Sequence, residues 1–450
     1  MAAFRIQDFI DGQKTRPIHI AVLAICALVM FIDGFDVFMV GKIAPAIAKG
    51  FGEEPKAMSL VFGLQQIGLA VGAFISTPMA DRFGRRRMLV WSSLIFGTLT
   101  IAAVFAQSLL QLAILRGFSG IFLSGVLPIA IPLLAEMTPK RRRGMFIAIA
   151  MAVFSTGAAA GGAVAVWLID DYGWQSGFWI GGLLPLLTVP LMLLLLPESL
   201  QYVVGRNPED PRIVKTLRRL DPTIQLTGQE VFTAGDGSVK GGKASLFDIF
   251  RGGRARTTTI AWLACVLSMG NIALLAAWLP TFFQEMAGIP IQRFAVFAMI
   301  AFAGGFVGTL TMGWLMDRFR PSRLIPLYFL CLAASLFAIG HVPFEAPGFL
   351  VALIAWNFFQ SGGQTGLNTL LTNVYPASMR STGLGWAGGA GRIGGVIFPL
   401  MAGLALGAHF TLPLTMGLIA LMPLVVALLV MQLRDGPNAA PEPAPKPAAA

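Results

Sequence analysis

The chain has 450 residues, of which 56% are hydrophobic and only 12% are charged. Water-soluble domains carry about 25% charged residues, so this composition excludes an ordinary soluble enzyme, a disordered chain and a coiled coil. A net charge of +11 would suggest a nucleic-acid partner for a soluble protein, but here it needs an explanation that suits a membrane.

Twelve apolar stretches are each long enough to form a membrane-spanning helix, which needs about 20 residues. Their continuous apolarity excludes the alternating pattern of a transmembrane barrel. The fold class is therefore an all-α membrane protein with 12 transmembrane helices. We expect the first stretch to be a retained helix, because no cleavage site of small residues follows a short apolar region. In chain order the predicted spans are 18–46, 57–79, 88–107, 109–135, 145–169, 176–197, 257–284, 292–316, 324–341, 347–372, 382–406 and 410–433.

The distribution of Lys and Arg between the spans predicts their orientation. With both termini in the cytoplasm, the inner segments hold 27 of these residues and the outer segments hold four. The positive net charge is therefore a signal of membrane topology and not of nucleic-acid binding. The four outer residues are Lys42, Lys49, Lys56 and Arg293.

A polar segment rich in Gly, Lys and Arg separates the first six spans from the last six. The tripeptide Asp-Arg-Phe at 81–83 recurs at 317–319, at the same topological place in each half. This recurrence predicts two six-helix pseudo-repeats, which is one established layout of membrane transporters. The predicted parts are a cytoplasmic N-terminus at 1–17, a bundle at 18–198, a cytoplasmic central loop at 199–256, a second bundle at 257–433 and a disordered cytoplasmic tail at 434–450.

Four ionisable side chains lie deep inside predicted spans, where a charge costs on the order of 3 kcal/mol. They are Asp33 and Asp36 in the first span, Arg116 in the fourth and Arg392 in the eleventh. An arginine fork matches a carboxylate, and a carboxylate inside the membrane can carry a proton. The set therefore suits an anionic substrate that moves together with protons. In the alternative interpretation, the four charges only neutralise one another and fix helix packing.

The tenth span carries a polar face made of Asn357, Gln360, Gln364 and Asn368. Amides that faced lipid would lack hydrogen-bond partners, so this face is expected to meet a cavity or another helix. Hydrogen bonding between helices is the alternative role of these amides. The sequence predicts no metal site and no enzyme, because the Cys and His residues are scattered and no nucleophile–base set is visible.

Several motifs together resemble the major facilitator superfamily and, within it, the aromatic acid:proton symporters, which include 4-hydroxybenzoate and protocatechuate carriers. The match to the acidic motif of that family lies at 33–36, and the inner-loop signature lies at 81–87. The other matching segments are RGFSGIFLSGVLP at 116–128, Glu136 with Pro139 and 142–144, LPES at 196–199, WLP at 278–280, GQTGLN at 363–368, Tyr375-Pro376 and GRIGG at 391–395.

The resemblance implies the major facilitator fold, in which two bundles rock about a central site and give alternating access. It implies import of an aromatic carboxylic acid by proton symport, with no cofactor, because the proton gradient drives transport. It further implies a multi-pass protein of the bacterial inner membrane that functions as a monomer. Its partners are then a small aromatic carboxylate, protons and the lipid bilayer, with no nucleic acid.

The resemblance assigns proton coupling to Asp33 and Asp36, and transport roles to Arg116 and Arg392. We expect the carboxylate of the substrate to pair with one of these arginines. The remaining predicted substrate-binding residues are Gln364, Asn368, Trp278 and Trp386. A cytoplasmic gate is predicted at Asp81, Arg82, Gly84, Arg85, Arg86, Glu136, Asp317 and Arg318, although basic residues there are also explained by topology alone.

Two other functions remain open at this stage. One is a proton-driven exporter of a drug or metabolite, because the fold fixes neither direction nor cargo. The other is a membrane sensor that binds an aromatic acid and signals through the central loop, which is short and holds no recognisable signalling domain.

Overall fold

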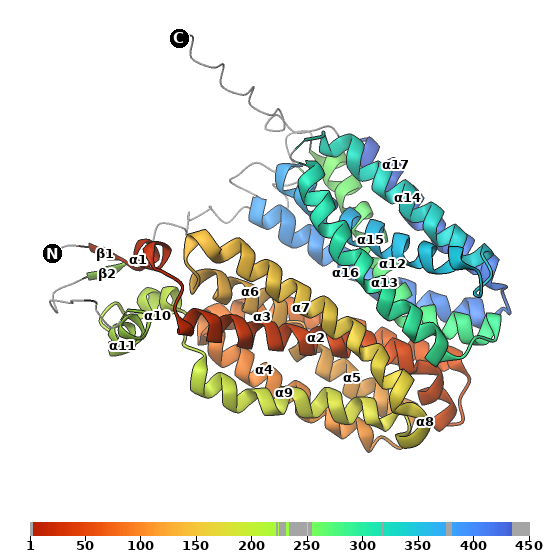
Figure 1. Cartoon of the computed structure of the whole chain (residues 1–450), viewed down its shortest axis with the longest axis horizontal. Coiled ribbons are helices and arrows are strands. Elements are labelled where there is room, and N and C mark those ends of the chain that lie inside the picture. The colour runs from red at the N-terminus through yellow and green to blue at the C-terminus, as the bar shows by residue number, and fades with distance from the viewer. Residues whose placement is uncertain are drawn as a thin grey trace, which may run out of the picture. The chain divides into compact units, whose positions relative to one another are not determined.

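The computed structural model describes residues 3–221, 224, 231–233, 250, 254–316, 318–374 and 380–433. For residues 3, 77, 81, 163–166, 372–374 and 380–382 it describes the backbone alone. Nearly all of this part of the chain is helical, as the sequence predicts (Figure 1).

Long helices occupy the predicted spans. Within the described part of the chain, 11 helical segments are long and apolar enough to cross a membrane. The remaining predicted span is α15 (Pro347–Val374), which has 28 residues. It is less apolar than the 11 other segments because of its amide side chains. The other long helices are α2 (Pro17–Gly50), α3 (Met58–Phe83), α4 (Arg85–Val104), α5 (Leu109–Leu123), α6 (Val126–Glu136), α7 (Lys140–Trp167), α9 (Gln175–Leu195), α12 (Ala255–Ala287), α13 (Ile291–Met316), α14 (Pro321–His341), α16 (Arg380–Gly407) and α17 (Leu412–Met431).

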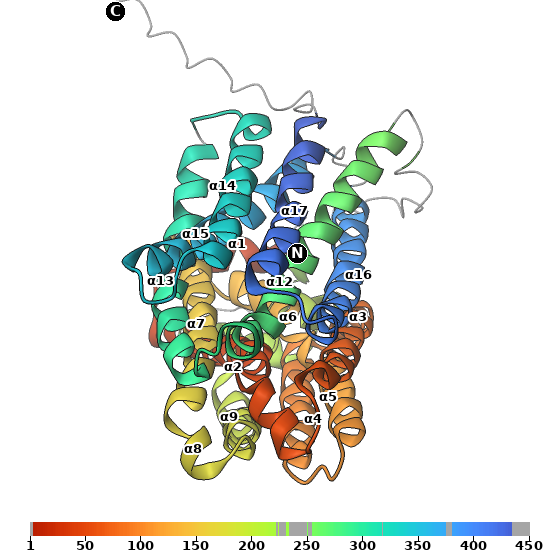
Figure 2. The same ribbon diagram turned by 90° about the vertical axis from the view of Figure 1, so that its right-hand side faces the viewer.

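The chain forms two compact units. The first comprises Met1–Lys240, Ala273–Phe302 and Val396–Thr411, and the second comprises Gly241–Ile272, Ala303–Gly395 and Leu412–Ala450. Three helices, α12, α13 and α16, therefore contribute residues to both units. In the second unit α14 lies between α15 and α17 (Figure 2). The division into bundles at 18–198 and 257–433 stays a prediction.

The most extensive helix contact of the first unit joins α2 to α7. It depends on two glycines, since a Cβ at Gly34 would overlap the carbonyl oxygen of Phe154, and a Cβ at Gly157 would overlap that of Phe31. Helices without side chains at the contact approach closely enough for dispersion forces to hold them together in lipid. This contact fixes the height of α2, the helix that carries both predicted proton-coupling acids.

A small cap at one end of the first unit was not predicted. It consists of β1 (Ala3–Arg5), α1 (Ile6–Gly12), α10 (Leu200–Arg206), α11 (Pro211–Leu220) and β2 (Val231–Thr233), with β1 and β2 parallel (Figure 1). Part of the cap had a sequence signal: Asp210 and Pro211 begin a helix, and buried Ile213, Leu217 and Leu220 share one face.

We predict that Gly157→Ala lowers the melting temperature of the protein, because the new methyl group has no room and overpacking costs about 1–3 kcal/mol. Gly144→Ala is the matched control in the same helix, since nothing lies within 4 Å of a Cβ there. Thermal unfolding in detergent measures both variants. Equal melting temperatures for the two would contradict the close approach of α2 and α7.

Candidate functional site

Asp36 of α2 and Arg116 of α5 form an ion pair in which neither side chain is exposed. Arg116 Nη1 donates to Asp36 Oδ1 at 2.9 Å, and Nη2 donates to Oδ2 at 2.5 Å. The Nε of Arg116 also donates to Gln65 Oε1 of α3 at 3.4 Å. The guanidinium carbon lies 5.7 Å from the centroid of the Phe178 ring on α9. Four helices therefore surround one charged pair.

The geometry of this pair has a chemical consequence. Both oxygens of Asp36 accept from the two ends of the arginine fork, which is the strongest arrangement of a carboxylate and a guanidinium. Protonation of Asp36 would remove one acceptor and release the fork for another carboxylate. In this conformation Asp36 and Arg116 neutralise each other, which is what the alternative interpretation requires of this pair. The transport roles of Asp36 and Arg116 stay predictions.

Asp33 lies one helical turn before Asp36 and is 4% exposed, so the second predicted proton-coupling acid is also buried. The two acids belong to the same stretch of α2 that packs on α7. Both acids are therefore buried within the first unit. Their assignment to proton coupling stays a prediction.

The second unit contains the polar face of α15. Gln364 Oε1 accepts from Ser268 Oγ of α12 at 2.6 Å, and Gln364 Nε2 donates to Asn368 Oδ1 at 3.0 Å. Asn368 lines a cavity of about 320 Å³ together with Cys265, Met269, Leu371, Leu384, Ala387 and Gly388. The predicted substrate residues Gln364 and Asn368 are thus joined to each other and border a cavity of suitable size for a small molecule.

Two buried amides in this unit have no hydrogen-bond partner within the described part of the chain. They are Gln360 of α15, which is 7% exposed, and Asn271 of α12, which is 1% exposed. An unsatisfied buried polar group costs about 1–3 kcal/mol, so native proteins keep few of them. These amides are available to a ligand, to water or to each other after a helix movement. Both were visible in the sequence only as polar residues within apolar helices.

Arg392 and Trp386 both belong to α16. Arg392 is half-buried, and Trp386 is 40% exposed with its ring stacked 6.2 Å from that of Trp262. Trp278 of α12 belongs to the first unit instead, where it is fully buried and its Nε1 donates to the Pro399 carbonyl at 2.8 Å. In this conformation Trp386 has an accessible face and Trp278 is a packing residue. Their contact with substrate stays a prediction.

Charged residues form a network at the predicted cytoplasmic end of the first unit, and their role as a gate stays a prediction. Arg85 of α4 pairs with Glu136 at the end of α6, and Glu136 Oε2 accepts from Ser199 Oγ at 2.5 Å. Glu198 Oε1 accepts from the backbone N–H of Arg86 at 2.9 Å. The side chain of Arg86 donates in turn to the carbonyls of Met192 and Leu193 near the end of α9.

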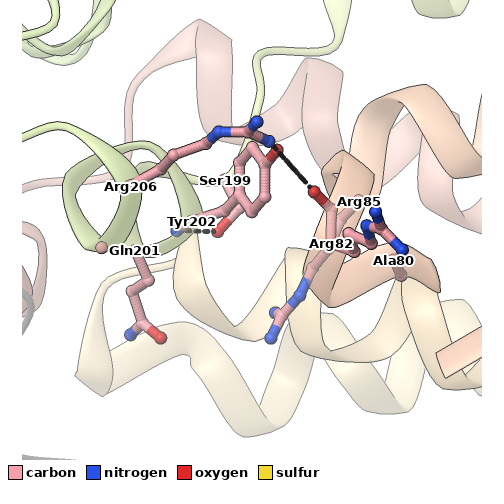
Figure 3. Close-up of a pocket in the computed structure, with 8 residues that line it drawn as sticks. Ala80, Arg82, Arg85, Ser199, Gln201, Tyr202 and Arg206 are labelled. Atoms are coloured by element: carbon pink, nitrogen blue, oxygen red, sulfur yellow. Dashed lines mark hydrogen bonds between the residues drawn. The ribbon is translucent and has the colours of Figure 1, made fainter. Parts of the chain in front are cut away.

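Residues of α10 complete this network beside a pocket of about 400 Å³. The carbonyl of Arg82 accepts from the Tyr202 hydroxyl at 3.1 Å and from Arg206 Nη1 at 3.2 Å (Figure 3). Tyr202 and Arg206 were not predicted, because nothing in the sequence shows that α10 folds back against the end of α3. Ser199 belongs to a motif visible in the sequence, but that motif did not indicate its role in this network.

Gly84 joins α3 to α4 in a conformation that other residues rarely adopt, with φ of +101°. A Cβ at this position would also lie 2.5 Å from Glu198 Oε2, so both the backbone and the space require glycine. The side chain of Asp81 and the whole of Asp317 lie outside the described residues. The guanidinium of Arg318 lies 3.9 Å from the Trp314 ring.

Membrane-spanning helices, an ion pair buried among them and a charge network at one end define a multi-pass membrane transporter. The profile of the Major Facilitator Superfamily matches residues 26–399, and the chain belongs to this family. The family consists of transporters, so the protein is a transporter and not an enzyme.

Individual relatives agree with this family. The chain is 33% identical over 431 residues to the gallate transporter of Pseudomonas putida, covering 96% of this chain and 95% of the relative. It is 32% identical over 397 residues to the 4-hydroxybenzoate transporter PcaK of the same organism, covering 87% of each. The fold is similar to the inward-open xylose transporter XylE from E. coli, with a TM-score of 0.71, 14% identity and coverage of 95% of this chain and 98% of that one. The predicted resemblance to the superfamily and to carriers of aromatic acids is confirmed.

We predict that Asp36→Asn alone destabilises the protein by about 3–5 kcal/mol, because it leaves the buried guanidinium of Arg116 without its counter-charge. The double variant Asp36→Asn/Arg116→Gln should recover part of this stability, since it removes both charges. Thermal unfolding in detergent measures the three proteins. If the double variant is less stable than Asp36→Asn, the pair is not the source of the loss.

We predict that Glu136→Gln slows transport by weakening the bond to Arg85, while the KM of the substrate stays nearly unchanged because Glu136 lies far from the spans' centres. Glu209→Gln on the exposed surface between α10 and α11 is the matched control. Initial rates of uptake into proteoliposomes, at equal protein content, measure both. A wild-type rate for Glu136→Gln would leave membrane topology as the only role of these charges.

Proposed function

We propose that this protein imports a small aromatic carboxylic acid together with protons by alternating access. The observation that carries the proposal is the similarity, over nearly the whole chain, to a gallate transporter and a 4-hydroxybenzoate transporter. The buried Asp36–Arg116 pair supplies a chemistry suited to this function. It offers a group that can take up a proton and a cation that can then bind a carboxylate.

The proposed coupling uses a competition between two acids for one arginine. While Asp36 is ionised it occupies both ends of the Arg116 fork. A proton on Asp36 weakens that pair, and the carboxylate of the substrate replaces Asp36 at the fork. Loss of the proton on the other side of the membrane reverses the exchange and expels the substrate. Asp33 is the second acid that we assign to proton transfer.

Recognition of the substrate would involve residues of the second unit as well. Arg392 is a second cation for the carboxylate, and Trp386 offers an accessible ring face. Gln364 and Asn368 already form a hydrogen-bonded pair beside a cavity, and hydroxyl groups on the aromatic ring would exchange bonds with such amides. The unsatisfied amides of Gln360 and Asn271 are further partners of this kind.

We place the protein in the bacterial inner membrane with both termini in the cytoplasm, as the bias of 27 inner against four outer Lys and Arg residues supports. The proton gradient drives transport in this proposal, so no cofactor takes part. One chain carries both predicted bundles and all the proposed site residues, which supports function as a monomer.

The decisive experiment measures uptake of 4-hydroxybenzoate and gallate into proteoliposomes with and without an acidic exterior. We expect faster uptake and accumulation with the pH gradient, because inward proton flow accompanies the acid. Asp33→Asn and Asp36→Asn serve as variants that should lose this accumulation. Wild-type uptake that ignores the gradient would refute symport.

The same measurements separate the two other functions. A proton-driven exporter would expel the acid from the vesicle while protons flow in, and it would move the acid out poorly when the vesicle interior is the acidic side. Cells without an exporter would also become more sensitive to the compound. A sensor would bind the acid without any saturable uptake by the purified protein. Either result would replace the proposed function.

A further inference from the structure

Lys42 is in an environment that its place in the sequence does not suggest. It was counted among the outer charges, yet it is 5% exposed and lies inside the first unit on α2. Its Nζ donates to the carbonyl of Ala158 on α7 at 2.5 Å. The same atom lies 5.0 Å from the centroid of the Phe302 ring on α13. An ammonium group is thus enclosed by three helices.

The Lys42 ammonium has no carboxylate partner among the described residues. Asp36, the nearest acid before Lys42 along α2, uses both of its oxygens on Arg116. Lys56, at the same end of the unit, pairs instead with Glu54 at 2.5 Å. A buried cation without a counter-charge destabilises a protein, and inside a membrane it marks a functional residue by default. An anion would supply the counter-charge that the described residues do not.

Two aromatic rings, those of Phe38 and Phe302, belong to the surroundings of this cation. Phe38 precedes Lys42 by one helical turn, so the two side chains lie on the same face of α2. The ring of Phe38 meets that of Phe302 edge to face, with centroids 5.6 Å apart. Both rings are only half-buried. A cation that contacts the Phe302 ring, with Phe38 packed against that ring, complements a molecule that carries a carboxylate on an aromatic ring.

We propose that Lys42, Phe38 and Phe302 form an outer acceptor site, which binds the aromatic carboxylate before it reaches the arginines deeper in the bundle. The inference rests on the proposed function. Lys42 follows Asp36 by six residues, which places it about 9 Å further along the helix toward the predicted outer side. In the present conformation the Phe302 ring and the Ala158 carbonyl contact the ammonium in place of the substrate. Separation of α13 from α2 opens the site.

The test compares Lys42→Met, Lys42→Arg and Lys49→Met in proteoliposome uptake of 4-hydroxybenzoate. Lys49 is the matched control because it is an exposed lysine on the same helix. Loss of one charge-assisted hydrogen bond should raise the KM of Lys42→Met about tenfold or more. Lys42→Arg should retain most of the affinity, and Lys49→Met should match the wild type. The neutral analogue 4-hydroxybenzamide should compete equally well against Lys42→Met and the wild type.

Thermal unfolding in detergent separates a binding role from a structural one. An unpaired buried charge costs stability, so Lys42→Met should melt at the wild-type temperature or above it. A lower melting temperature for Lys42→Met, or an unchanged KM, would overturn the acceptor site while leaving the proposed function intact. If the wild type itself takes up no aromatic acid, the proposed function fails and the acceptor site fails with it.

Discussion

A charge inside a lipid bilayer has no water to stabilise it, and the first unit of this transporter is organised by that constraint. Asp36 and Arg116 stabilise each other, because both oxygens of the carboxylate accept from the guanidinium. Gln65 accepts a further hydrogen bond from Arg116, and the ring of Phe178 packs against the guanidinium. Because the pair joins α2 to α5, its neighbours on α3 and α9 are held at fixed heights. The glycine contact at Gly34 holds the same stretch of α2 closely against α7. The same ion pair therefore stabilises the helix packing and carries the carboxylate to which we assign the coupled proton.

The two buried cations of α2 and α5 differ in a way that suits a transport path. Arg116 has a resident carboxylate, and its fork becomes free only when that carboxylate changes. Lys42 has a carbonyl and a ring, both weaker partners for an ammonium than a carboxylate is. An anion arriving from the predicted outer side would thus meet the less satisfied cation before the more satisfied one.

The opposite end of the same unit uses charges for a different purpose. Glu136 and Glu198 accept from groups on α4 and at the start of α10, and they lie within a turn of helix ends. Bonds of this kind are partly solvated, so they can break and re-form as helices shift without the cost of exposing a charge to lipid. The cap formed by β1, α1, α10, α11 and β2 buries Ile6, Ile10 and Leu217, which belong to the same apolar core as buried residues of α2, α4, α6 and α7. It ties the N-terminal segment to the segment that follows α9, with Arg16 bound to Asp221 at 2.9 Å.

The sequence by itself determined the spans, the placement of four charges within them and the family. Each of these depends on local information, namely apolar length, charge position and short motifs. Only the tertiary structure decided which acid Arg116 binds, that Lys42 is enclosed with no carboxylate partner among the described residues, that Trp278 is a packing residue, and that β1 pairs with β2. Those outcomes depend on which helix faces meet, and helices in lipid associate through shape and polar contacts that a hydropathy pattern does not encode.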